Sequence, residues 1–191
     1  LAFDEGVAHP ETLLADRKKR FGGYRPTNFN GLSHGLITAR YALQESLNIP
    51  AVTLLNEVGP RRFLSRLHNV GVYPRLRNVG SSPGLAVALG GVGMSLEQLV
   101  ATYGALARGG KFKNLSFYKD VNTVGDVAFF DQKTTASVVE ILKETPRPQR
   151  RYGERSNRRI AFKTGTSSGH RDVLALGFDD TYTVGVWIGH P

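Results

Sequence analysis

Two short motifs in this sequence contain the residue types that an acyl-transfer enzyme needs. One is Ser46-Leu47-Asn48, and the other is Lys163-Thr164-Gly165-Thr166. Transfer of an acyl group from a peptide requires a nucleophile, a proton relay, an oxyanion hole and groups that hold the substrate. A serine hydroxyl can relay a proton, an asparagine amide can pair with a substrate amide, and a lysine can bind a carboxylate. The two motifs therefore indicate a serine–lysine acyl-transfer site.

Each motif also fits a purely structural role when it is considered alone. Ser46 and Asn48 are common capping residues, and they precede Pro50, which suits the first turn of a helix. The lysine motif also fits the end of a strand where the chain turns. On an edge strand, Gly165 would have no side chain to prevent a substrate from pairing alongside as a further strand. The functional interpretation rests on both motifs occurring together and in this order.

The elements that hold these motifs are predicted to be helices followed by an antiparallel sheet. Apolar spacing predicts helices over 36–47, 50–57, 63–70, 96–106 and 134–143, with Ser95 and Asp131 as N-caps of the last two. Strands are predicted over 160–165, 173–178 and 182–188, and Trp187 is expected in the core. Residues 1–33 are expected to be loop-rich. This order predicts one α+β domain, for which 191 residues suffice.

Longer stretches of the sequence resemble the class A penicillin-binding proteins. The stretches around the motifs are Glu45-Ser-Leu-Asn-Ile-Pro-Ala-Val52, Lys163-Thr-Gly-Thr-Ser-Ser-Gly-His-Arg-Asp172 and Val184-Gly-Val-Trp-Ile-Gly189. Further stretches are Tyr24-Arg-Pro-Thr-Asn-Phe29, Ala88-Leu-Gly-Gly91 and Ala107-Arg-Gly-Gly110. The resemblance extends from about Phe3 to Pro191 and is greatest to the penicillin-binding protein 1C subgroup. It implies the α+β transpeptidase fold shared with serine β-lactamases, in which an antiparallel sheet is packed between helices.

The resemblance implies a role for each motif residue. Ser46 would relay a proton between the catalytic lysine and the leaving amine, and Asn48 would bind the amide of the donor peptide. Lys163 would set the electrostatic field beside Ser46. In the rest of the lysine motif, Thr164 would hold the terminal carboxylate of D-Ala-D-Ala, and the Thr166 backbone N–H would donate to the oxyanion hole.

The nucleophile motif of that family, Ser-x-x-Lys, should precede Ser-x-Asn, and no such motif precedes Ser46. The one match in the sequence is Ser116-Phe-Tyr-Lys119, in a segment without helical periodicity, and an exposed loop serine is the favoured interpretation. The resemblance places the start of the chain just past the catalytic serine. Residues 1–191 are therefore expected to be a partial transpeptidase domain that cannot acylate alone and that exposes hydrophobic surface meant for its missing part.

For the whole protein, the resemblance implies a D,D-transpeptidase that acts on peptidoglycan. Its partners would be stem peptides and glycan strands derived from lipid II, and β-lactams would inhibit it by mimicking the donor. It would be anchored in the bacterial inner membrane, face the periplasm and carry a glycosyltransferase domain upstream. No cofactor is implied. The five histidines lack metal-ligand spacing, so no metal is expected.

Two other classes of function remain open from the sequence. A β-lactam sensor or a β-lactamase-like domain would share the motifs, although the Glu-x-x-Leu-Asn stretch of class A β-lactamases is absent. A basic module that binds nucleic acid or the cell wall would use the net charge of +9 and the arginines within 147–159. The stretch 145–159 that contains these arginines has two prolines and one tyrosine, which favours a solvated linker over a nucleic-acid surface.

Overall fold

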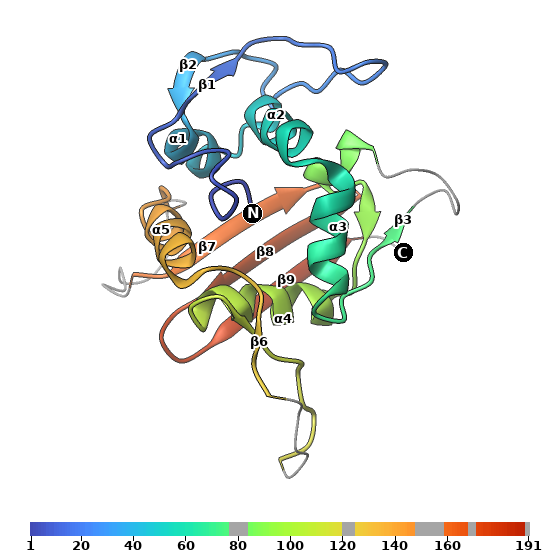
Figure 1. The fold of residues 1–191 in the computed structure, drawn as a ribbon, viewed down its shortest axis with the longest axis vertical. Helices are drawn as coiled ribbons and strands as arrows, with labels where there is room; N and C mark the ends of the chain where they lie inside the picture. Colours follow the sequence, from blue (N-terminus) through green and yellow to red (C-terminus); the bar gives the residue numbers. More distant parts are fainter. Residues whose placement is uncertain (77–83, 120–124, 148–158, 168–170, 190–191) are drawn as a thin grey trace.

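The computed structural model describes residues 1–76, 84–119, 125–147, 159–167 and 171–189 (Figure 1). Its main sheet has three antiparallel strands in the order β7 (Ala161–Thr166), β8 (Asp172–Phe178) and β9 (Thr183–Gly189). The turn between β8 and β9 is closed by Asp179, whose carboxylate accepts hydrogen bonds from the N–H groups of Thr181 and Tyr182, both at 2.8 Å. The three predicted strands and the turn between the last two are confirmed.

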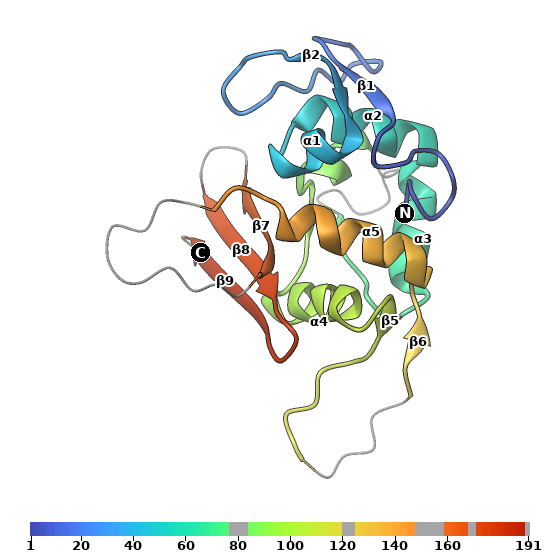
Figure 2. The same cartoon turned by 90° about the vertical axis from the view of Figure 1, so that its left-hand side faces the viewer.

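Two helices, α4 (Leu96–Ala107) and α5 (Gln132–Lys143), pack against this sheet (Figures 1 and 2). Phe178 is buried between them, with its ring edge-on to Tyr103 of α4 and in one cluster with Leu142 of α5. Gly185 of β9 allows the close approach of α4, because a Cβ there would lie 2.5 Å from Val100 Cγ2. The sheet and these two helices therefore pack together into one unit, which carries the lysine motif on β7.

Helices α2 (Asn48–Val58) and α3 (Pro60–His68) pack against each other. Two short strands, β1 (Leu13–Asp16) and β2 (Gly35–Thr38), form a hairpin-like ladder that leads into α1 (Ala39–Gln44) at one end of the molecule (Figure 2). The smaller elements are β3 (Arg75–Leu76), the 3₁₀ helix η1 (Leu85–Leu89), β4 (Val92–Gly93), β5 (Lys111–Phe112) and β6 (Val127–Ala128).

Both predicted N-caps are confirmed. The Ser95 hydroxyl accepts from the Gln98 N–H at 3.1 Å while the Gln98 side chain accepts from the Ser95 N–H at 3.0 Å, which is a complete capping box. The Asp131 carboxylate accepts from the N–H groups of Lys133 and Thr134. No helix in the described part of the chain combines the length and the apolar character that a membrane span needs.

Three details of the sequence prediction are wrong. Residues 36–38 are not helical, because Leu36 and Ile37 pair with β1 and the helix begins at Ala39, where the Thr38 hydroxyl caps it by accepting from the Tyr41 N–H. Residues 1–33 are not wholly irregular, since β1 lies among them. Trp187 is 45% exposed, because β9 is at the edge of the described sheet, and its indole N–H donates to Asp172.

Candidate active site

Ser46 lies at the bend between α1 and α2 and has an unusual backbone conformation. Its φ of 56° makes it the one non-glycine residue with positive φ among those that the structure describes. The bend is a Schellman motif, because the Ser46 N–H donates to the Leu43 carbonyl and the Leu47 N–H to the Ala42 carbonyl. Glycine is the usual residue at this position, because a side chain raises the conformational energy of a residue with positive φ. The serine found here places an exposed hydroxyl at the end of α1.

Lys163 reaches this hydroxyl from the sheet. Its ammonium donates hydrogen bonds to Ser46 Oγ and, at 3.0 Å, to the Thr164 carbonyl. Burial lowers the pKa of Lys163 from its ordinary value, because desolvation disfavours the ammonium. Two residues 117 positions apart in the sequence thus form one hydroxyl–ammonium pair.

The rest of the lysine motif lies on the outer edge of β7. Thr164, Gly165 and Thr166 are all exposed, and their described sheet partner is β8 alone. A Cβ built on Gly165 meets no described atom within 4 Å, and the φ of Gly165 is not in the left-handed region. Neither backbone conformation nor internal packing requires a glycine there. An exposed edge strand with a bare position suits a ligand that pairs along it.

Asn48 begins α2, two residues after Ser46. Its side-chain amide donates to the Thr27 carbonyl at 2.7 Å, and its backbone N–H donates to the side-chain oxygen of Asn28 at 2.9 Å. The sequence-predicted residues Ser46 and Lys163 are therefore in direct contact. Asn48 lies on the same bend as Ser46, held by the 27–28 segment.

Sequence reasoning missed three residues that support this bend. The buried carboxylate of Asp16 accepts from the Asn28 amide at 2.8 and 2.9 Å and from the backbone N–H of His34 at 2.8 Å, and the His34 ring Nδ1 lies 2.8 Å from it. In the sequence, Asp16 begins a run of charged residues and Asn28 stands among turn-forming residues, and neither pattern indicates a buried contact. The available signal was the family-like stretch that contains Asn28.

The chain also contains features that can be set aside as sites for this chemistry. Ser116 is exposed, its hydroxyl bonds to the Tyr118 carbonyl at 2.6 Å, and its segment leads away from α1 and α2 toward the opposite end of the molecule (Figures 1 and 2). The described residues contain no cluster of metal-ligating side chains. His170 and nearly all of the 147–159 arginine segment lie outside the described residues.

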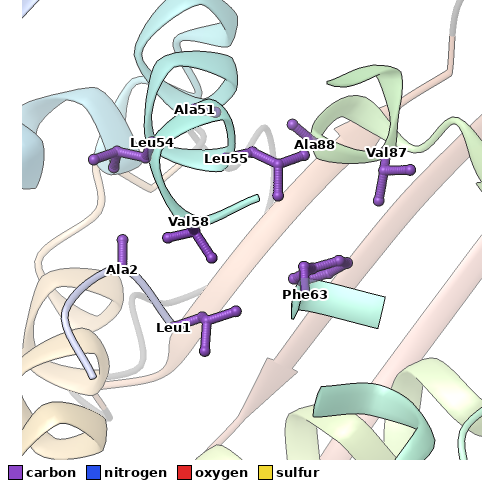
Figure 3. Close-up of a pocket in the computed structure, with 9 residues that line it drawn as sticks. All are labelled: Leu1, Ala2, Ala51, Leu54, Leu55, Val58, Phe63, Val87 and Ala88. Atoms are coloured by element: carbon purple, nitrogen blue, oxygen red, sulfur yellow. The ribbon is translucent and has the colours of Figure 1, made fainter. Parts of the chain in front are cut away.

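An apolar pocket of about 200 Å³ lies beside α2 (Figure 3). It is lined by Leu1, Ala2, Ala51, Leu54, Leu55, Val58, Phe63, Val87 and Ala88. None of these side chains can act as a nucleophile, acid or base. The pocket is therefore a packing feature, and the chemistry lies at the Ser46–Lys163 contact.

Comparison with known proteins decides the family. The family described as "Penicillin binding protein transpeptidase domain" matches residues 1–187. The chain belongs to this transpeptidase family. Penicillin-binding protein 1C of Escherichia coli is 39% identical to this chain over its whole length. Penicillin-binding protein 1F of Bacillus subtilis is 27% identical over 99% of the chain. The chain spans 24% and 28% of the lengths of these two relatives.

Solved structures agree on the fold of the transpeptidase chain. The apo transpeptidase domain of Burkholderia pseudomallei penicillin-binding protein 3 superposes with a TM-score of 0.77 at 20% identity, covering 100% of this chain and 67% of that one. PonA1 of Mycobacterium tuberculosis, solved in complex with penicillin V, gives 0.78 at 18% identity, covering 98% and 57%. The predicted family and the α+β transpeptidase fold are confirmed.

Proposed function

We propose that this chain is the donor-binding part of a peptidoglycan D,D-transpeptidase, which transfers an acyl group from a D-Ala-D-Ala stem peptide to an amine. The observation that carries this proposal is the hydrogen bond between the Lys163 ammonium and Ser46 Oγ, beside an open strand edge. A hydroxyl held against an ammonium of lowered pKa is suited to proton relay. Membership of the transpeptidase family supports the same reaction.

In this proposal each residue of the site has one task. Ser46 passes a proton to the leaving D-alanine amine, and Lys163 stabilises the charge that develops beside it. Asn48 pairs with an amide of the donor. Thr164 binds the terminal carboxylate, Gly165 leaves room for the donor to lie along β7, and the Thr166 N–H donates to the oxyanion.

We further propose that residues 1–191 are a partial domain whose nucleophile is supplied by residues outside them. The sequence contains one Ser-x-x-Lys match, and the exposed position of Ser116 at the far end of the molecule supports excluding it. In the intact protein the nucleophilic serine would attack the D-Ala-D-Ala bond, and D-alanine would leave with the relayed proton. An amine would then attack the acyl-enzyme, form the cross-link and release the serine.

The whole protein is proposed to be anchored in the inner membrane, to face the periplasm and to carry a glycosyltransferase domain. Peptidoglycan stem peptides and glycan strands are its proposed partners, and β-lactams its inhibitors. A pocket of about 330 Å³ lined by Lys18, Lys19, Arg20, Arg25, Pro26 and Thr27 supports an acidic substrate. One of its lining residues, Thr27, is linked to Asn48, because the Thr27 carbonyl accepts the Asn48 side-chain amide.

Fluorescent penicillin tests both parts of the proposal. We expect a covalent adduct that survives denaturation on the intact protein and no adduct on a polypeptide of residues 1–191. Prior incubation with unlabelled penicillin should abolish the signal. An adduct on the 191-residue polypeptide would show that a nucleophile lies within it. An intact protein that takes up no label would contradict transpeptidase function.

Replacing Gly165 by valine should block the donor without weakening the fold. Valine suits a strand, and its side chain would enter open space on the face of β7 that Lys163 shares, where the donor is proposed to lie. We expect the second-order rate constant of acylation by penicillin to fall at least about tenfold. Steric overlap with a few added heavy atoms typically costs at least about 1.4 kcal/mol, which corresponds to a tenfold change. The melting temperature should be unchanged. Ala128→Val on exposed β6 is the matched control and should leave acylation unchanged.

A further inference from the structure

The side chain of Asn28 connects the loop after β1 to the start of α2. It is only 4% exposed, and both ends of its amide have partners. The nitrogen donates to both Asp16 carboxylate oxygens and, at 2.8 Å, to the Leu32 carbonyl. The oxygen accepts from the N–H groups of Asn48 at 2.9 Å and Ile49 at 3.4 Å. Asn28 thus uses its full hydrogen-bonding capacity across three segments.

These bonds complete the N-terminus of α2. A helix begins with four N–H groups that have no partner inside it, and the N-cap residue Leu47 provides no side-chain hydrogen bond. The Leu47 N–H donates to the Ala42 carbonyl, and Pro50 has no N–H. The two that remain, on Asn48 and Ile49, both donate to Asn28. A residue some 20 positions away in sequence therefore caps the helix that carries the Ser46-x-Asn48 bend.

Asp16 determines which way the Asn28 amide points. A carboxylate only accepts hydrogen bonds, so the amide nitrogen must face Asp16 and the amide oxygen must face α2. Asp16 is fully buried at the end of β1, and His34 donates to it from just before β2. Burial alone would raise the pKa of Asp16, but hydrogen bonds from Asn28 and His34 outweigh burial and hold the pKa below its ordinary value. The carboxylate form that orients Asn28 is thereby favoured.

We infer that Asn28, oriented by the Asp16 carboxylate, is a positioning residue that sets the place of Ser46 and Asn48 opposite Lys163. The bend is held from the α1 side by the Schellman hydrogen bonds, and from the α2 side by Asn28 and by the Thr27 carbonyl, which accepts the Asn48 side-chain amide. Loss of Asn28 would leave α2 free to shift where it meets the bend. The catalytic consequence rests on the proposed transpeptidase function, whereas the structural consequence does not.

The first test measures penicillin acylation of the intact protein, with the limiting rate constant separated from the apparent binding constant. We expect Asn28→Ala and Asp16→Asn each to lower the limiting rate constant by about ten- to a hundredfold, since small displacements of a catalytic group have effects of this size. The matched control is Asn30→Ala, because Asn30 is an exposed residue of the same loop and its side chain accepts only from the nearby Leu32 N–H. Asn30→Ala should acylate at the wild-type rate.

A double exchange separates positioning from a general loss of structure. In Asp16→Asn/Asn28→Asp the new amide at position 16 can donate to the new carboxylate at position 28, which still accepts from the α2 N–H groups. We expect Asn28→Asp alone to be slow, because it places two carboxylates side by side, and the double variant to recover part of the rate, because the Leu32 carbonyl still lacks its donor. A double variant that recovers the wild-type melting temperature but none of the rate would overturn the inference.

Amide hydrogen exchange gives a readout that does not depend on activity. In Asn28→Ala, a peptide covering residues 46–51 should exchange faster, whereas peptides from α4 and α5 should not change. If the wild-type protein takes up no penicillin, the proposed function fails while exchange still decides the positioning of α2. Unchanged exchange at 46–51, or a folded Asn28→Ala variant that acylates at the wild-type rate, would overturn the inference.

Discussion

Replacing Lys163 by methionine in the intact protein is expected to lower the rate of acylation by penicillin at least about a hundredfold, the usual cost of removing one preorganised charge or donor from an active site. The ammonium donates to Ser46 Oγ, and methionine of similar length cannot. Because burial disfavours the charged form of Lys163, the methionine variant should melt at or above the wild-type temperature. Lost activity without lost stability is the signature of a residue that acts in the reaction.

The dependence on pH gives this prediction a direction. Burial lowers the pKa of Lys163, so the ammonium is present below that lowered pKa and is lost as the pH rises through it. Activity that depends on the ammonium should therefore decline at a lower pH than an ordinary lysine would give. Lys163→Arg keeps its charge at every accessible pH, so this alkaline decline should shift upward in the arginine variant.

Lys143→Met is the control, because Lys143 lies on α5 and its ammonium pairs with Glu140 at 3.5 Å rather than with Ser46. It should acylate at the wild-type rate. A Lys163→Met protein that keeps the wild-type rate would show that the contact with Ser46 has no part in the reaction. If the decline of the acylation rate at alkaline pH is the same in Lys163→Arg as in the wild type, another group is responsible for that decline.

Local signals in the sequence predicted the fold where the determining contacts are themselves local. The Ser95 capping box and the Asp131 cap each involve residues within three positions, and both formed as expected. The strand β8 was predicted from the apolar run 173–178, and Leu176 and Phe178 are its buried residues, two positions apart. Caps and apolar runs of this kind can be recognised without knowing which distant residues they contact.

The site depends on contacts that no local pattern contains. Ser46 and Lys163 were brought together by the family resemblance rather than by spacing, because 117 residues separate them. Asp16 begins a run of charged residues, and its burial is explained by its hydrogen bonds with Asn28 and His34, 12 and 18 residues further along the chain. The strand β1 was missed because its four residues acquire their structure by pairing with β2. The strand propensity of individual residues is a weak guide where the pairing of two strands determines the structure.

Ser46 should show opposite effects on stability and activity, which a pair of variants can separate. Its φ of 56° costs an L-residue about 1 kcal/mol that glycine does not incur. Ser46→Gly should therefore be about 1 kcal/mol more stable to denaturant than Ser46→Ala, which keeps the strain and lacks the hydroxyl. Both variants should lose at least about a hundredfold in acylation rate, because neither can relay a proton.

The comparison is informative because the two variants remove the same hydroxyl. Ser137→Ala, which removes a hydroxyl that donates to the Lys133 carbonyl within α5, is the control for loss of a serine hydroxyl and should change neither quantity appreciably. Equal stability of Ser46→Gly and Ser46→Ala would mean that the bend relaxes and holds no strain. Wild-type acylation by Ser46→Ala would exclude proton relay. If both expectations hold, the protein retains serine at a glycine position because its hydroxyl is needed beside Lys163, at a measurable cost in stability.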